Sequence, residues 1–357
     1  MSAAVAGKLR VMLCDDSSTV RSALARVLES DPGIVVVARV GDGAQALAAL
    51  DAAPLAERAQ VVLLDLEMPV MDGMTALPLI LRREPRPIVI VASALTQRGA
   101  SATMEALRAG AADYIPKPGA AGGGLNDPAF RADLLAKVKG WAKLRQPAAR
   151  MPEAPARSTP MRRGEPPRVI CIGSSTGGPQ ALAALVRRLP RQITLPMLIV
   201  QHMPAGFTAM LAKHLDALGG PPVSEARHGD MVEAGRIYLA PGDHHLVAKA
   251  EGQRVTLHLA DTPTENFCRP AVDPTLRSLI AIYGRAVHAV ILTGMGQDGL
   301  LGCRALAQAG GAVWAQDEAS SVVWGMPGAI ARAGLAEAQG TPESLGDALA
   351  QICGKRP

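Results

Sequence analysis

The second half of the chain opens with the stretch Val169-Ile170-Cys171-Ile172-Gly173-Ser174-Ser175-Thr176-Gly177-Gly178-Pro179. The stretch predicts a short apolar strand, a glycine-flanked turn and a helix over residues 179–188. The turn matches the pattern Gly-x-Ser-x-Gly, in which the central serine, here Ser175, exposes its hydroxyl and nearby backbone N–H groups can hold an oxyanion. A turn that binds phosphate at a helix N-terminus is the alternative, and the rest of the chain must distinguish the two.

The composition of the 357-residue chain favours two globular domains. No run is long and apolar enough to span a membrane, and the first residues lack an apolar signal core, so we expect a cytoplasmic protein without membrane insertion. The five cysteines form no Cys-x-x-Cys pair, so we expect no structural zinc site. The formal net charge is +5, but several excess arginines fall in one proline-rich segment, and we therefore expect no nucleic-acid partner.

The first half of the chain alternates between apolar strand patterns and helix patterns. The expected strands cover residues 9–14, 35–39, 61–64, 88–92 and 112–115. The run Val61–Leu64 is uniformly apolar, as a parallel strand buried on both faces should be. Five alternations of strand and helix predict an α/β fold with a doubly wound parallel sheet.

Polar residues gather where these strands end. They are Asp15, Asp16, Asp65, Ser93 and Lys117. Ligands of open α/β sheets bind at the carboxyl ends of the strands. Three crowded carboxylates repel one another unless a hard cation such as Mg²⁺ neutralises them, and a carboxylate beside such a cation can accept a phosphoryl group. Helix capping is the alternative for any one of these residues, but it does not account for all five together.

Residues 8–128 resemble the receiver domain of bacterial response regulators, which has a flavodoxin-like fold. The matching residues are Asp15-Asp16, Leu64-Asp65-Leu66-Glu67-Met68-Pro69-Val70-Met71-Asp72-Gly73, Ser93 and Tyr114-Ile115-Pro116-Lys117. The resemblance implies that Asp65 accepts phosphate from a histidine kinase. It implies Mg²⁺ ligands at Asp15, Asp16, Asp65 and the backbone carbonyl of Glu67. It also implies that Ser93 and Lys117 sense the phosphoryl group, and that Tyr114 moves on activation.

A segment rich in proline and arginine separates the two halves. Residues 126–144 predict a final helix of the first half, and residues 146–167 then contain six prolines among small residues and arginines. Such a composition is typical of an extended linker. We therefore expect a receiver domain at residues 8–128, a terminal helix and linker at 129–167, and a second domain at 168–352.

The second half repeats the alternation of strand and helix, which predicts a second doubly wound parallel sheet. Ser175, His202 and Asp298 each lie just beyond the end of an expected strand. Acyl transfer by serine uses a hydroxyl, an imidazole that takes its proton and a carboxylate that orients the imidazole. The common α/β-hydrolase order is serine, acid, histidine, whereas this chain has serine, histidine, acid. His288 lies inside an expected strand and is therefore not the expected base.

Residues 168–352 resemble the catalytic domain of the protein-glutamate methylesterases of bacterial chemotaxis. The matching motifs are Ile172-Gly173-Ser174-Ser175-Thr176-Gly177-Gly178, Gln201-His202-Met203-Pro204, Arg269-Pro270-Ala271-Val272-Asp273 and Leu292-Thr293-Gly294-Met295-Gly296-Gln297-Asp298-Gly299. The resemblance implies that Ser175 is the nucleophile, His202 the base and Asp298 its orienting acid. It implies oxyanion donors at the Met295 backbone N–H and at Thr176, and no cofactor in this site.

Two departures from the family pattern stand out. Ser174 occupies a position where alanine is usual, and Glu265-Asn266-Phe267-Cys268 precedes Arg269 where the family often has basic residues. The second departure affects the expected contacts with the receptor.

Together the two resemblances imply a phosphorylation-activated serine esterase that removes methyl esters from glutamates on chemoreceptor helices and deamidates receptor glutamines. The alternative is a response regulator whose second domain only binds a protein, DNA or a nucleotide. The chain has no helix-turn-helix signature, which disfavours DNA. No acidic ribose-binding residue follows the glycine-rich turn at the distance that a dinucleotide fold requires.

Overall fold

The computed structural model of the chain describes residues 7–117, 124, 127–145 and 166–354. The chain divides into two compact units, Met1–Gln146 and Pro147–Pro357. The proline- and arginine-rich part of the expected linker, residues 146–165, lies outside the described residues. Within the described ranges, no helix combines the length and the hydropathy needed to cross a membrane.

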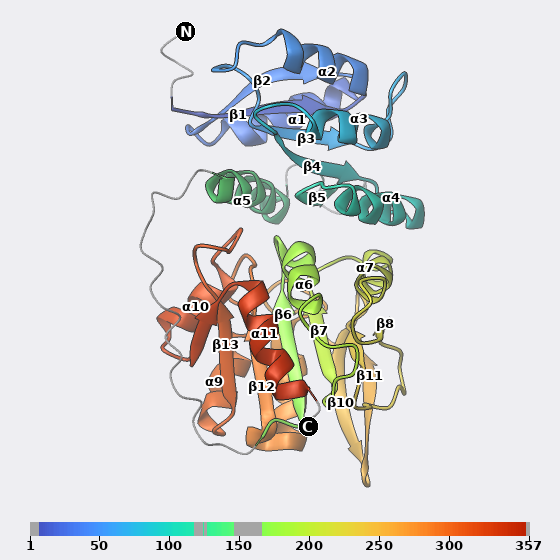
Figure 1. Cartoon of the computed structure of the whole chain (residues 1–357), viewed down its shortest axis with the longest axis vertical. Helices are drawn as coiled ribbons and strands as arrows, with labels where there is room; N and C mark the ends of the chain where they lie inside the picture. The colour runs from blue at the N-terminus through green and yellow to red at the C-terminus, as the bar shows by residue number, and fades with distance from the viewer. Residues whose placement is uncertain (1–6, 118–123, 125–126, 146–165, 355–357) are drawn as a thin grey trace. The chain divides into compact units, whose positions relative to one another are not determined.

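The first unit is a five-stranded parallel sheet with helices between its strands (Figure 1). The strands lie in the order β2-β1-β3-β4-β5, and every pair is parallel. Their bounds are β1 Leu9–Cys14, β2 Ile34–Val40, β3 Val61–Asp65, β4 Ile88–Ser93 and β5 Asp113–Pro116. The helices are α1 Ser18–Glu29, α2 Gly43–Ala52, α3 Gly73–Leu81, α4 Gln97–Arg108 and α5 Pro128–Arg145. This order is the flavodoxin-like one, so the expected fold is confirmed.

Side-chain caps determine where the helices of the first unit begin. The Ser17 hydroxyl accepts a hydrogen bond from the Val20 N–H at 3.3 Å, and α1 begins at the next residue. Thr96 accepts from the Gly99 N–H at 2.9 Å, so α4 begins at Gln97. The sequence pattern predicts this helix only from residue 101, which is wrong because that prediction overlooks the Thr96 cap.

The second unit contains a seven-stranded parallel sheet in the order β14-β13-β12-β6-β7-β9-β8 and a separate antiparallel hairpin, β10–β11. The strands are β6 Val169–Ser174, β7 Met197–Gln201, β8 Val223–Glu225, β9 Ile237–Leu239, β10 His245–Glu251, β11 Arg254–Ala260, β12 Val287–Ile291, β13 Ala312–Gln316 and β14 Ala338–Gly340. The helices are α6 Gly178–Val186, α7 Phe207–Asp216, α8 Val272–Tyr283, α9 Leu300–Gln308, α10 Met326–Arg332 and α11 Pro342–Cys353. The second expected α/β fold is also confirmed.

Strand β6 lies in the middle of this sheet, and its residues alternate between two apolar layers. Val169 and Cys171 belong to a buried cluster that also contains residues of α8, α9 and α10. Helices α6 and α11 pack against each other, and Figure 1 shows both of them in front of the parallel sheet. The sequence pattern predicts two consecutive strands, at residues 236–239 and 255–259, joined through Pro241-Gly242-Asp243. That connection is wrong, because strand β10 lies between them in the chain. Strand β9 joins the large sheet, whereas β11 pairs with β10.

Candidate active site

Ser175 lies in the turn between β6 and α6, at the carboxyl end of the central strand. The turn depends on glycine at two places. Gly177 has a φ of 74°, and a side chain there would collide with Val322. Gly294 lies so close to Ser175 that an added Cβ would stand 2.8 Å from the Ser175 Cβ. Only a chain with these glycines brings the turn after β12 against the serine.

The two adjacent serines have different surroundings. Ser174 is fully buried, and its hydroxyl donates to the Gln201 Oε1 at 2.7 Å. The Gln201 amide in turn donates to the Ser175 carbonyl oxygen at 2.9 Å. Ser175 itself is partly exposed. Ser174 therefore supports the turn, whereas Ser175 remains partly exposed to solvent.

His202 and Asp298 form a close pair beside this turn. The His202 Nε2 lies 2.7 Å from the Asp298 Oδ2. His202 follows β7, and Asp298 lies in the loop after β12, while β6 has β7 and β12 as its two neighbours in the sheet. The three predicted residues therefore follow three adjacent strands. This is the crevice at which open α/β sheets bind ligands, because the strand order reverses there.

Asp298 is buried and accepts hydrogen bonds on both of its oxygens. Besides His202, its donors are the Val272 N–H (2.6 Å), the Asp273 N–H (3.2 Å), the Gly299 N–H (2.9 Å) and the Asn266 Nδ2 (3.0 Å). Burial alone would raise the pKa of Asp298, but the hydrogen bond from His202 and those from the backbone outweigh it and lower the pKa. The carboxylate therefore stays ionised, with its oxygens fully engaged.

The other nitrogen of His202 contacts a thiol. The His202 Nδ1 lies 3.3 Å from the Cys268 Sγ. Burial would lower the pKa of His202, but its hydrogen bonds with Asp298 and Cys268 outweigh burial and raise the pKa well above its ordinary value. Among the described residues, no hydrogen bond joins the Ser175 hydroxyl to His202. In this structure the His202 Nε2 faces Asp298 and the Nδ1 faces Cys268.

The predicted oxyanion donors lie in the two turns that flank Ser175. Within the described part of the chain, the backbone N–H of Met295 donates to no other group, and Met295 is partly exposed. Thr176 is buried, and its carbonyl oxygen accepts a hydrogen bond from the Thr293 hydroxyl at 2.9 Å. Thr293 also accepts the Ser175 N–H at 3.0 Å through its own carbonyl, so it holds the two turns together.

His288 is buried in β12, and no described residue gives its Nε2 a hydrogen-bond partner. Burial lowers the pKa of His288 to about 4. Its ring packs edge-on against Trp314, with the ring centroids 4.2 Å apart. A neutral histidine enclosed in the sheet cannot reach a substrate, which agrees with its rejection as the base.

Four residues that contact this site are missing from the sequence prediction. They are Gln201, Asn266, Cys268 and Asp273. Asn266 connects the two buried carboxylates, because its Nδ2 donates to the Asp273 Oδ2 and to the Asp298 Oδ1, both at 3.0 Å. Burial, and then repulsion from Asp298, raise the pKa of Asp273, although a hydrogen bond from the Gly302 N–H opposes them. All four residues lie in or beside quoted motifs, but spacing alone does not show which side chains converge.

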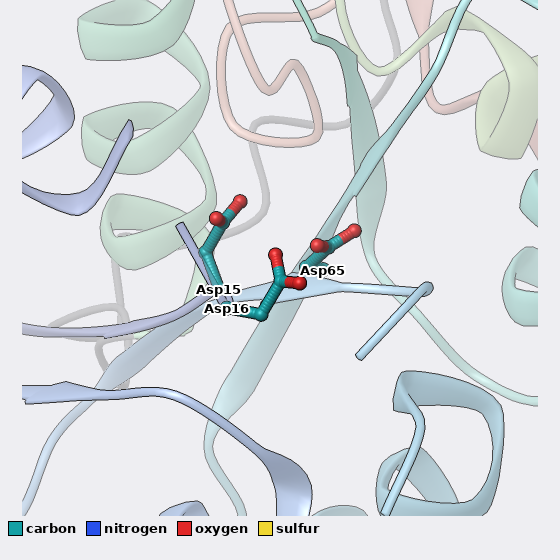
Figure 2. Close-up of side chains that lie close together, drawn as sticks. All are labelled: Asp15, Asp16 and Asp65. Atoms are coloured by element: carbon teal, nitrogen blue, oxygen red, sulfur yellow. The ribbon is translucent and has the colours of Figure 1, made fainter. Parts of the chain in front are cut away.

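The first unit has its own cluster of polar residues at the carboxyl edge of its sheet. Figure 2 shows the carboxylates of Asp15, Asp16 and Asp65 gathered together, and one oxygen of each lies within 4.8 Å of the others. Asp15 and Asp65 are buried, whereas Asp16 is exposed. Three carboxylates with one side open to solvent are a suitable donor set for a hard cation such as Mg²⁺.

Lys117 partly neutralises this cluster. Its Nζ lies 2.5 Å from the Asp65 Oδ2 and 2.9 Å from the Asp15 Oδ2. Burial nevertheless raises the pKa of Asp65, and the hydrogen bond with Lys117 only partly offsets that effect. The predicted phosphoacceptor is therefore a carboxylate in a poorly hydrated position with a cationic neighbour.

Of the remaining predicted residues, Ser93 and Glu67 lie at the same edge, whereas Tyr114 lies inside β5. Ser93 ends β4, and its buried hydroxyl donates to the Gly99 carbonyl at 2.9 Å. The Glu67 N–H donates to the Asp65 Oδ1 at 3.2 Å, which places Glu67 in the loop that follows the acidic residue. Tyr114 on β5 is buried, and the Lys137 Nζ lies 4.8 Å from its ring centroid.

Comparisons with known proteins agree for both units. Residues 170–349 match the CheB methylesterase family, and residues 11–123 match the response regulator receiver domain family. The protein-glutamate methylesterase/protein-glutamine glutaminase 1 of Paramagnetospirillum magneticum is 46% identical, with 92% of each chain covered. The protein-glutamate methylesterase/protein-glutamine glutaminase of Azospirillum brasilense is 47% identical, with 92% of this chain and 89% of the relative covered.

A solved structure extends this similarity to the fold. The Thermotoga maritima CheB methylesterase catalytic domain is 40% identical, with a TM-score of 0.51, 52% of this chain covered and 98% of that chain. Both family matches, the near full-length relatives and this structure lead to one assignment. The chain belongs to the family of protein-glutamate methylesterase/protein-glutamine glutaminase response regulators.

Proposed function

We propose that Ser175, His202 and Asp298 hydrolyse the methyl esters of glutamate residues on chemoreceptor helices and deamidate receptor glutamines. The observation that carries the proposal is the contact of His202 with Asp298, 2.7 Å apart. These two residues follow the strands on either side of β6, and β6 leads to the partly exposed Ser175. Relatives that match over nearly the whole chain are named for the same two activities.

The reaction begins when the Ser175 Oγ attacks the ester carbonyl carbon and its proton passes to the His202 Nδ1. The carbonyl oxygen becomes an oxyanion, which accepts the Met295 N–H and a hydrogen bond from Thr176. The C–O bond to the methoxy group then breaks, and His202 gives its proton to the departing methanol. In the second step a water molecule attacks the carbonyl carbon of the acyl-enzyme, and His202 takes its proton. The bond to the Ser175 Oγ then breaks, His202 returns the proton to Ser175, and the receptor side chain is left as glutamate. With glutamine as the substrate, ammonia leaves in place of methanol.

Asp298 has the role of orienting this base. Its oxygens accept five hydrogen bonds, so it holds the imidazole at Nε2 and stabilises the imidazolium without taking a proton itself. The Cys268 thiol occupies the neighbourhood of Nδ1 in this structure. The thiol must therefore release Nδ1 before the Ser175 proton can be transferred.

Phosphorylation of Asp65 by a histidine kinase is the proposed switch of this activity. The ligands proposed for Mg²⁺ are Asp15, Asp16, Asp65 and the carbonyl of Glu67. A cation bound there neutralises the negative charge that a phosphoryl group adds to the cluster. Lys117 and Ser93 then contact the phosphoryl oxygens, and Tyr114 changes position with them. We assign this switch to residues 8–128, a terminal helix and linker to 129–167, and catalysis to 168–352.

A pair of single substitutions tests the assignment of the nucleophile. Ser175→Ala removes the attacking oxygen, so methanol release from methylated receptors should fall by about 10⁴-fold or more, and a fluorophosphonate probe should no longer label the protein. Ser174→Ala removes a buried hydrogen bond worth about 0.5–1.5 kcal/mol of stability and should leave labelling intact. Undiminished turnover in the Ser175 variant refutes the proposal and favours a second domain that only binds.

A further inference from the structure

A tight turn beside His202 holds one aromatic side chain in an unusual backbone conformation. The turn joins Glu265 and Cys268 through two backbone hydrogen bonds, from the Glu265 N–H to the Cys268 carbonyl (3.1 Å) and from the Cys268 N–H to the Glu265 carbonyl (2.9 Å). Its two central residues, Asn266 and Phe267, have φ values of 52° and 63°. Two-residue turns of this kind prefer asparagine followed by glycine, because both central residues need positive φ.

Phe267 occupies the second central position of this turn, where glycine is the favoured residue. A bulky residue with positive φ is strained, and this one gains no burial in return. Its exposed fraction is 98%, and no other large apolar side chain in the described part of the chain is as exposed. Neither the strain nor the exposed ring stabilises the free protein, which points to a role in binding.

Two of the turn's other three members contact predicted catalytic residues, and the third joins the turn to helix α8. Cys268 contacts the His202 Nδ1 at 3.3 Å, and the Asn266 Nδ2 donates to the Asp298 Oδ1 at 3.0 Å. Glu265 pairs through both of its carboxylate oxygens with Arg277 on α8. The backbone of Phe267 is consequently held in a turn whose two neighbouring residues contact His202 and Asp298, so its exposed side chain starts from a fixed point beside these residues.

We propose that Phe267 is a substrate-docking residue, which packs against apolar side chains of the receptor helix on either side of the scissile glutamyl ester. The inference rests on the proposed function, since it takes the methylated receptor helix as the occupant. A helix presents the residues three and four positions from the ester on the same face as the ester, within reach of a ring beside the base. Aromatic side chains dominate binding when an exposed ring becomes fully desolvated.

Substitutions at Phe267 separate docking from folding and from chemistry. Phe267→Gly places the favoured residue in the turn, so the thermal midpoint should stay the same or rise. The KM for methylated receptor should increase about tenfold, with kcat unchanged. Phe267→Leu, which keeps an apolar side chain, should restore most of the affinity. Met231→Ala, a change at another exposed apolar residue of the same unit, serves as the matched control and should leave KM unaltered.

The rate of labelling by a small fluorophosphonate probe provides the second readout. The probe needs a reactive Ser175 but no receptor contact, so the Phe267→Gly variant should be labelled at the wild-type rate. An unchanged receptor KM overturns the proposal. Equal losses in labelling and in receptor turnover also overturn it, because they assign Phe267 to shaping the site. A change in self-association or in the response to phosphorylation, with KM constant, assigns the ring to a second copy or to the receiver and overturns it as well. Absence of labelling in the wild type instead refutes the proposed function.

Discussion

The two parallel sheets of this protein use buried aspartates at their carboxyl edges in opposite ways. Asp65 accepts a hydrogen bond from Lys117 and one from a backbone N–H, and burial raises its pKa. Asp298 accepts from His202, three backbone N–H groups and Asn266, and these bonds lower its pKa. Asp65 ends strand β3, and Asp298 lies in the loop after strand β12 of the same kind of sheet. The position at a strand end therefore does not by itself determine the chemistry.

The number and identity of the donors make the difference. Asp65 retains acceptor capacity next to two further carboxylates, and such a group can bind a cation or react with a phosphoryl donor. Asp298 has its capacity filled by five donors, which suits the orienting role beside His202 that we propose for it. The first sheet thus leaves the Asp65 carboxylate available for reaction, whereas the second holds the Asp298 carboxylate in place through its hydrogen bonds.

We expect the largest loss of activity from a substitution of Asp298. Asp298→Asn keeps the size of the side chain but offers an amide to His202, which then adopts the wrong tautomer. Receptor methylesterase kcat should fall by about 10⁴-fold, and the rate of fluorophosphonate labelling should fall with it. The matched change Asp273→Asn alters a neighbouring buried carboxylate that does not contact His202, and it should cost far less activity. Comparable losses in both variants would contradict the special role of Asp298.

We expect the second largest effect from a substitution of Asp65 in the first unit. Asp65→Asn removes the phosphoacceptor, so incorporation of phosphate from acetyl phosphate should disappear and the stimulation of esterase activity with it. Basal fluorophosphonate labelling should persist, because the three residues proposed for catalysis follow strands of the other sheet. Asp51→Asn, an exposed aspartate paired with Arg83 in the same unit, is the control and should be phosphorylated normally. Phosphate uptake by the Asp65 variant would move the acceptor to another residue.

The smallest effect is a change in pH dependence. His202 must be neutral to take the serine proton, and its pKa is raised, so activity should fall as pH decreases, by about tenfold per unit below the His202 pKa. The midpoint should lie above the ordinary histidine value of about 6.5. Cys268→Ala removes one of the two groups that raise the pKa, so the midpoint should shift to lower pH. A pH profile of kcat with no shift would show that the thiol does not act on the base.

Most of the architecture was predictable, because buried parallel strands leave uniform apolar runs such as Val61–Leu64. The exceptions have physical causes. Strand β9 covers only three residues, too few to show a period, and its neighbours in the large sheet are β7 and β8 rather than the nearby hairpin. Helix α4 begins four residues before its apolar pattern, since the Thr96 cap is a single polar residue.

The sequence by itself determined which residues stand at the strand ends, because each follows directly from a local apolar run and a turn. Ser175, His202 and Asp298 belong to this group, as do the acidic residues around Asp65. Only the tertiary structure decided that Asn266 joins two carboxylates, that Cys268 contacts the base and that Phe267 stays exposed. These contacts bring together segments up to 66 residues apart in the chain. Which residues meet depends on how whole strands and helices pack, and a local sequence pattern contains no information about that packing.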